Sequence, residues 1–114
     1  MNQITVILEN ANTLDYYELE KILIRNGINA KVNHKELDGS ELGLTFEELI
    51  ILLPLLTPIV VQLRKAFEAF LDYKKPFNRK ISITLEKKGK KLQITSENND
   101  LIDIKELSSF FDEN

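Results

Sequence analysis

Apolar and polar residues alternate in four segments of this chain, as they do in half-buried β-strands. These segments are residues 3–9, 28–33, 81–86 and 92–94. Two other segments repeat apolar residues every three or four positions, which predicts helices over residues 13–26 and 103–111. Gly27 follows the first helix at a position where a left-handed residue often ends one. Gly89 lies between the last two strands, and we predict a β-hairpin with a turn over residues 87–90.

The central run Leu49–Leu63 contains no charged residue and is interrupted by two prolines. Thr45 and Glu48 have the spacing of a capping box, which predicts that a helix begins at Phe46. Pro54 lacks the N–H that the helix needs at that point, so we expect a kink there. The second proline favours a fresh start of the helix. Beyond it, an amphipathic pattern continues almost to the third proline.

These patterns predict an α+β fold with the element order β-α-β-α-β-β-α. The polar segment 34–43 contains two glycines and is a loop in this prediction. We expect the first β-α-β unit to cross over in the right-handed sense and to leave its two strands parallel. The expected sheet is mixed and four-stranded. One face is packed by the long kinked central helix and two shorter helices, and the other face is solvated. Residues 1–114 form a single domain in this prediction.

The first half of the predicted central helix carries more apolar residues than one sheet can cover. A small domain has one layer of helices, so we expect part of this surface to stay exposed and to bind a partner. The predicted partner-binding residues are Leu49, Ile50, Ile51, Leu52, Leu53, Leu55 and Leu56. Burial under the flanking helices and contact with a membrane are the alternatives. The apolar run would span about 22 Å as a helix, short of the roughly 30 Å bilayer core, so a membrane is not an expected partner.

The composition is that of a globular protein, with 43% hydrophobic and 29% charged residues. The sequence contains no cysteine, which excludes disulfide bonds, thiolate metal sites and cysteine nucleophiles. The N-terminus has no pattern of a secretory signal, and we therefore predict a cytoplasmic protein.

The formal net charge of −3 hides a basic centre between acidic flanks. Residues 64–91 carry ten bases against three acids, whereas residues 1–48 carry nine acids against four bases. A basic segment can attract phosphate groups. This one consists mostly of lysine and has no aromatic-studded RNA-binding strand, so no nucleic acid is expected as a partner.

Residues able to carry chemistry are few and scattered. His34 is the sole histidine and falls in the predicted loop, where such residues are usually solvated. Glu36, Asp38 and Glu41 could gather a cation, but their spacing is not that of an EF-hand. The sequence has no phosphate-binding glycine loop and no nucleophile elbow. We therefore predict no catalytic, cofactor-binding or metal-binding residue, and a protein that is not an enzyme.

The order of motifs in the second half of the chain is distinctive. A loop with Gly39 and Gly43 leads into an apolar helix that ends in the aromatic and basic stretch 70–75. A strand–turn–strand with Gly89 in its turn follows, and a last helix starts after Leu101. This order resembles the effector-associated constant component family of bacterial conflict and immunity systems. The helix here is rich in leucine and isoleucine, where that of the family is rich in small residues. The resemblance implies a binding role and carries over no catalytic residue.

We therefore expect a non-enzymatic adaptor or scaffold that associates with an effector protein in a bacterial defence system. The exposed apolar helix would bind the effector, further copies of this chain, or both. The alternative is an immunity protein that inhibits a toxin through its charged surfaces. Binding through charged surfaces weakens as salt is raised, which separates the two hypotheses.

Overall fold

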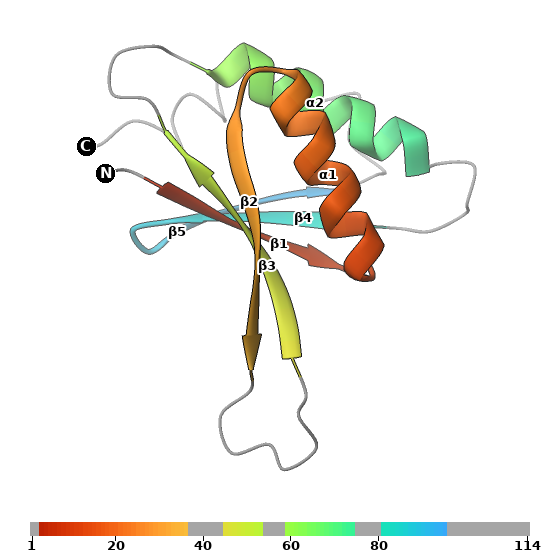
Figure 1. The fold of residues 1–114 in the computed structure, drawn as a ribbon. Coiled ribbons are helices and arrows are strands. Elements are labelled where there is room, and N and C mark those ends of the chain that lie inside the picture. The colour runs from red at the N-terminus through yellow and green to blue at the C-terminus, as the bar shows by residue number, and fades with distance from the viewer. Residues whose placement is uncertain (1–2, 37–44, 54–58, 75–80, 96–114) are drawn as a thin grey trace.

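The computed structural model describes residues 3–36, 45–53, 59–74 and 81–95. In these residues, five strands form one sheet and two helices cover one of its faces (Figure 1). The elements in chain order are β1 (Gln3–Glu9), α1 (Thr13–Arg25), β2 (Asn29–Glu36), β3 (Thr45–Leu52), α2 (Val60–Lys74), β4 (Ser82–Lys87) and β5 (Lys90–Thr95).

The strands lie in the order β2-β3-β1-β4-β5, and every neighbouring pair is antiparallel. β1 and β2 run in the same direction because each is antiparallel to β3, which lies between them. The first β-α-β unit is therefore split by a strand that comes later in the chain. The class α+β is confirmed, but the predicted mixed, four-stranded sheet is wrong, because the sheet has five strands and all its neighbouring pairs are antiparallel.

The prediction of a helix that begins at Phe46 and runs through the apolar residues up to Leu53 is wrong, because residues 45–52 form β3. Leu49 and Ile51 point toward the helices and are fully buried. Ile50 alternates with them and is only partly buried. Ile50 and Leu52 on the second face of β3 are apolar as well, so its sequence lacks the clear alternation of a half-exposed strand.

Other sequence-based expectations have mixed outcomes. The hairpin is confirmed, with Lys88 and Gly89 at positive φ in its turn. The helix after the second proline is also confirmed: α2 ends at Lys74 and buries the stripe Leu63, Ala66, Phe67, Phe70 and Leu71. The kink at Pro54 and the last helix over residues 103–111 lie outside the described residues.

The core lies between the helices and the inner face of the sheet. Its fully buried side chains include Phe67 and Phe70 of α2 and Leu19 and Leu23 of α1. The central strands add Ile4, Val6, Leu49, Ile51, Ile83 and Leu85. α1 also shields the edge of the sheet, because Glu20 Oε2 accepts a hydrogen bond of 2.8 Å from the Val32 N–H of β2. An edge strand with its outward N–H groups occupied is a poorer template for pairing with another chain.

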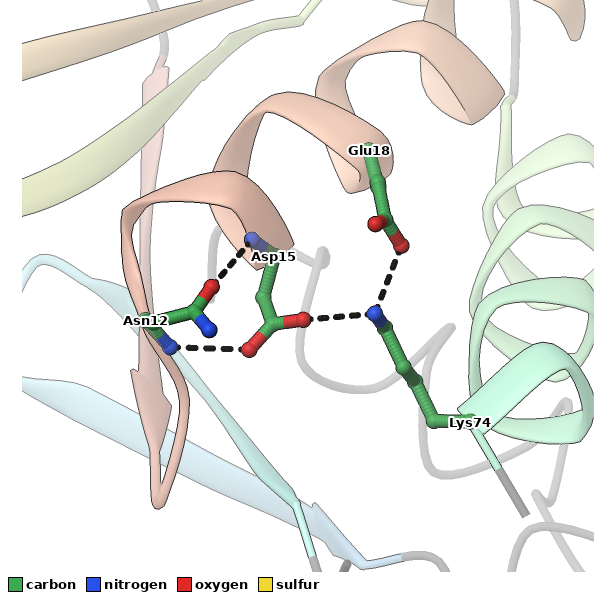
Figure 2. A network of polar contacts seen from close by, with 4 residues as sticks. All are labelled: Asn12, Asp15, Glu18 and Lys74. Carbon is green, nitrogen blue, oxygen red and sulfur yellow. Dashed lines mark hydrogen bonds and ion pairs between the residues drawn. The ribbon is translucent and has the colours of Figure 1, made fainter. Parts of the chain in front are cut away.

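A buried ion cluster joins the start of α1 to the end of α2 (Figure 2). Lys74 Nζ lies 2.6 Å from Asp15 Oδ1 and 2.7 Å from Glu18 Oε2. Asp15 and Lys74 are 1% and 5% exposed. Burial lowers the pKa of Lys74, but the hydrogen bonds to Asp15 and Glu18 outweigh it and leave this pKa above its ordinary value. The ammonium group therefore stays charged where it is buried. We call Asp15, Glu18 and Lys74 the ion cluster.

Neither described helix has both the length and the apolar composition needed to cross a membrane.

The alternation of burial along β3 can be tested with two matched substitutions. We expect Ile51→Ala to lower the free energy of unfolding by about 3 kcal/mol, because it opens a cavity in the core. Ile50→Ala should cost about 1 kcal/mol, since that side chain is only partly buried. Denaturation in urea measures both values. Equal losses at the two positions would contradict the strand assignment.

The ion cluster makes a prediction about stability and pH. Lys74→Met should lower the free energy of unfolding by about 3 kcal/mol, because two carboxylates lose their buried counter-charge. The folded-state pKa of Lys74 lies above its ordinary value of 10.5. Its contribution is therefore complete below that pH and is lost as the pH rises through the folded-state value.

Urea denaturation of the unaltered protein and of Lys74→Met, between about pH 7 and about pH 11, measures the contribution of Lys74 to stability. Lys65→Met, on the exposed side of α2, is the control and should change stability by less than about 0.5 kcal/mol. A Lys74→Met loss that is equally small at about pH 7 would show that the ion cluster does not stabilise the fold.

Candidate functional site

β1 and β3 separate at one end of the sheet. Their pairing covers Gln3–Val6 of β1, whereas β3 continues to pair with β2 as far as Thr45. The Tyr16 hydroxyl of α1 lies where β3 would otherwise pair with the backbone N–H and carbonyl of Leu8. It accepts a hydrogen bond of 2.9 Å from the Leu8 N–H and donates one of 3.3 Å to the Leu8 carbonyl oxygen. We call this place the fork between β1 and β3.

Three elements bring polar side chains together on the β3 side of the fork. β2 contributes His34, and β3 contributes Glu47, which is the register partner of His34. The first turns of α1 contribute Thr13 and Tyr17, which lie four residues apart and so on one side of the helix. We call Thr13, Tyr17, His34 and Glu47 the His34 cluster.

The two nitrogens of His34 have different neighbours. Nε2 lies 2.7 Å from the Tyr17 hydroxyl, and Nδ1 lies 3.7 Å from Glu47 Oε1. The same Glu47 oxygen accepts a hydrogen bond of 2.6 Å from the Thr13 hydroxyl. In the neutral ring, this arrangement favours a proton on Nδ1 and an Nε2 that accepts the Tyr17 hydroxyl proton. The proton positions follow from the hydrogen-bond network.

The cluster is open to solvent on one side. The His34 side chain is 45% exposed and that of Glu47 is 18% exposed, so the carboxylate is the more enclosed of the two. The rings of Tyr17 and His34 are tilted by 45° with their centroids 6.0 Å apart. A ligand could therefore reach the Tyr17 oxygen and the imidazole while Glu47 stays behind the ring.

The surroundings of the fork keep Tyr16 protonated. Burial raises the pKa of Tyr16, and the negative charges of Glu47 and Glu48 raise it further, against the hydrogen bond with Leu8. Tyr16 thus remains a neutral hydrogen-bonding group that holds α1 against β1. Its neighbour Tyr17 is the tyrosine that reaches the imidazole.

The sequence analysis missed this cluster. His34 was expected in a loop without a function, but β2 extends to Glu36 and includes it. Of the other acidic residues considered for a cation, Asp38 and Glu41 lie outside the described residues. Within the described part of the chain, no group of three His, Asp or Glu side chains could hold a metal ion. The cluster could not be predicted because residues 45–52 were expected to form a helix. As strand β3, they place Glu47 opposite His34.

Those of the predicted partner-binding residues that the structure describes do not form an exposed helical surface. Leu49 and Ile51 are fully buried in the core. Ile50, Leu52 and Leu53 are partly buried in and just after β3. The remaining two, Leu55 and Leu56, lie outside the described residues.

Comparison with known proteins gave few matches. No family model matches the chain, and no curated protein matches it. A solved structure of a phage SAM lyase in complex with S-methyl-5′-thioadenosine is similar at 14% sequence identity and a TM-score of 0.38. The similarity covers 84% of this chain and 91% of that chain.

That structure is of an enzyme, whereas the sequence analysis predicted a non-enzymatic adaptor and a chain that is not an enzyme. Residues 45–52, which the adaptor hypothesis placed in an exposed apolar helix, form a central strand instead. A similarity this distant assigns neither an activity nor a substrate to the present chain.

The geometry of His34 predicts an unusual tautomer that can be observed directly. Because His34 is the sole histidine, labelling histidine with ¹⁵N gives the signals of one ring. We expect the neutral ring to carry its proton mainly on Nδ1, the nitrogen that faces the Glu47 carboxylate, which leaves Nε2 to accept from Tyr17. Tyr17→Phe should shift the proton toward Nε2, whereas Lys65→Met at an exposed position of α2 should leave the signals unchanged. A ring protonated mainly on Nε2 in the unaltered protein would contradict the site as described.

Proposed function

We propose that this chain is an enzyme that transfers protons to and from a small molecule at Tyr17, His34 and Glu47. The observation that carries the proposal is the 2.7 Å contact between the Tyr17 hydroxyl and His34 Nε2, with Glu47 on the other side of the ring. A proton-donating group, a base and a carboxylate that orients the base are the parts from which general acid–base sites are built.

The roles follow from the positions of the atoms. The Tyr17 oxygen takes a proton from the bound molecule while its own proton passes to His34 Nε2. The imidazolium formed in this step is stabilised by the carboxylate of Glu47 beside Nδ1, and the bound molecule carries the matching negative charge. Transfer in the reverse direction returns the proton and restores the neutral ring.

Thr13 and the sheet hold Glu47 in place for this role. The Thr13 hydroxyl donates to Glu47 Oε1, which leaves that oxygen beside the imidazole. The backbone of Glu47 is paired with that of His34 in the β2–β3 register. Side chains that are fixed by strands and helices keep their relative positions better than side chains on loops.

The resemblance to the effector-associated constant component family also enters as a proposal. It is supported by the order of α2, which ends in an aromatic and basic stretch, and a hairpin with Gly89 in its turn. From this resemblance we propose that the chain works in the cytoplasm beside an effector protein, or with further copies of itself. Nucleic acid and membrane are not partners in this proposal.

Association can be tested separately from chemistry. Light scattering of the purified chain, with a mass of 13.2 kDa, should give a multiple of that value, or the chain should co-purify with the effector encoded beside its gene. A protein that stays monomeric and does not co-purify with the product of any neighbouring gene would contradict the proposal of association.

Proton transfer can be tested with 5-nitrobenzisoxazole, a small molecule that opens to a coloured phenolate when a base removes its ring proton. We expect the unaltered protein to open it about 100-fold faster than His34→Gln or Tyr17→Phe, which is typical of a lost acid–base group. Lys65→Met is the control, because Lys65 lies exposed on α2 and should not affect the rate. Equal rates for the unaltered protein and His34→Gln would rule out a proton-transfer site at this position.

A further inference from the structure

The first two turns of α1 contribute residues to both the ion cluster and the His34 cluster. Asp15 and Glu18 contact Lys74 of α2 in the ion cluster. Thr13 and Tyr17 contact Glu47 and His34 on the sheet side. On a helix with 3.6 residues per turn, positions 13 and 17 lie on one side, and positions 15 and 18 lie on another. The same two turns of α1 therefore carry two of the three residues of the ion cluster and two of the four residues of the His34 cluster.

The ion cluster also fixes the exact start of the helix (Figure 2). Asp15 Oδ1 contacts Lys74 Nζ, while Oδ2 of the same carboxylate accepts a hydrogen bond of 2.8 Å from the Asn12 N–H. The Asn12 side chain in turn accepts a hydrogen bond of 3.0 Å from the Asp15 N–H. Lys74 thus holds the carboxylate that closes the capping box, and Thr13 is the first residue after the cap.

From these contacts we infer that Lys74 is a positioning residue for the His34 cluster, acting through Asp15 and Glu18. This inference rests on the proposed function, because the cluster it positions is the proposed proton-transfer site. The ammonium group holds two carboxylates that would otherwise repel each other on adjacent turns. Without the Lys74 ammonium group, the first two turns of α1 shift, and the Tyr17 hydroxyl moves away from His34.

The tyrosine next to Lys74 gives the ammonium group a further contact. Lys74 Nζ lies 5.1 Å from the centroid of the Tyr73 ring, within the range of a cation–π interaction. The ammonium group is thus held by side chains from both helices. Its position depends on how the end of α2 sits on α1, and the His34 cluster depends on it in turn.

The test uses the single histidine as a reporter. In ¹⁵N-histidine protein, Lys74→Met should reduce the population of the Nδ1–H tautomer of His34, and the rate with 5-nitrobenzisoxazole should fall about tenfold. Glu18→Gln removes one of the two carboxylates at a partly exposed position and should give a smaller change of the same sign. It serves as the second variant if Lys74→Met does not fold.

Two controls separate positioning from loss of stability. Ile83→Val destabilises the core at β4, far along the sheet from His34, and should leave the histidine signals unchanged. Lys65→Met removes an exposed lysine from the same helix and should also leave them unchanged. A tautomer population that is unaffected by Lys74→Met and Glu18→Gln, or that changes equally in Ile83→Val, would overturn the inference. A tautomer shift in a protein that does not open 5-nitrobenzisoxazole would support positioning and contradict the proposed function alone.

Discussion

The position of β3 between β1 and β2 determines where almost every other group in this structure lies. Leu49 and Ile51 are paired on both sides and stand beneath the helices, with their register partners Val6, Val32, Ile4 and Ala30. A slip by one residue would turn this whole layer to the opposite face of the sheet, so burial of the layer fixes the register. The same register sets Glu47 opposite His34. The packing of the core thereby determines the geometry of the candidate site.

The two helices are held together by a buried group of charged side chains as well as by hydrophobic burial. The Lys74 ammonium is buried with two carboxylates, and removing one partner from such a group is costly because the others lose their compensation. The ion cluster ties the last residue of α2 to the first turns of α1. Tyr16, on the same turns, ties α1 to β1 at the fork. α1 is therefore held from two sides at the point where Thr13 and Tyr17 meet the sheet.

Sequence patterns correctly predicted the helices and strands that have one polar and one apolar face. They failed for β3, which is apolar on both faces over residues 49–52. α1, the stripe of α2 and the β4–β5 hairpin each have a polar and an apolar side, and each was predicted close to its observed position. In β3, Ile50 and Leu52 on the second face are apolar as well, and a continuous apolar run does not distinguish a strand from a helix. The His34 cluster could not be predicted, because its residues meet only after β3 pairs with β2.

The central claim is that β3 brings Glu47 beside an imidazole that Tyr17 also reaches. The most direct measurement is a nuclear Overhauser experiment on the full chain. The account predicts cross-strand contacts between the backbones of His34 and Glu47, together with contacts between the ring protons of His34 and Tyr17. Helical contacts between successive amides across residues 45–52, with no contact between the two rings, would contradict it.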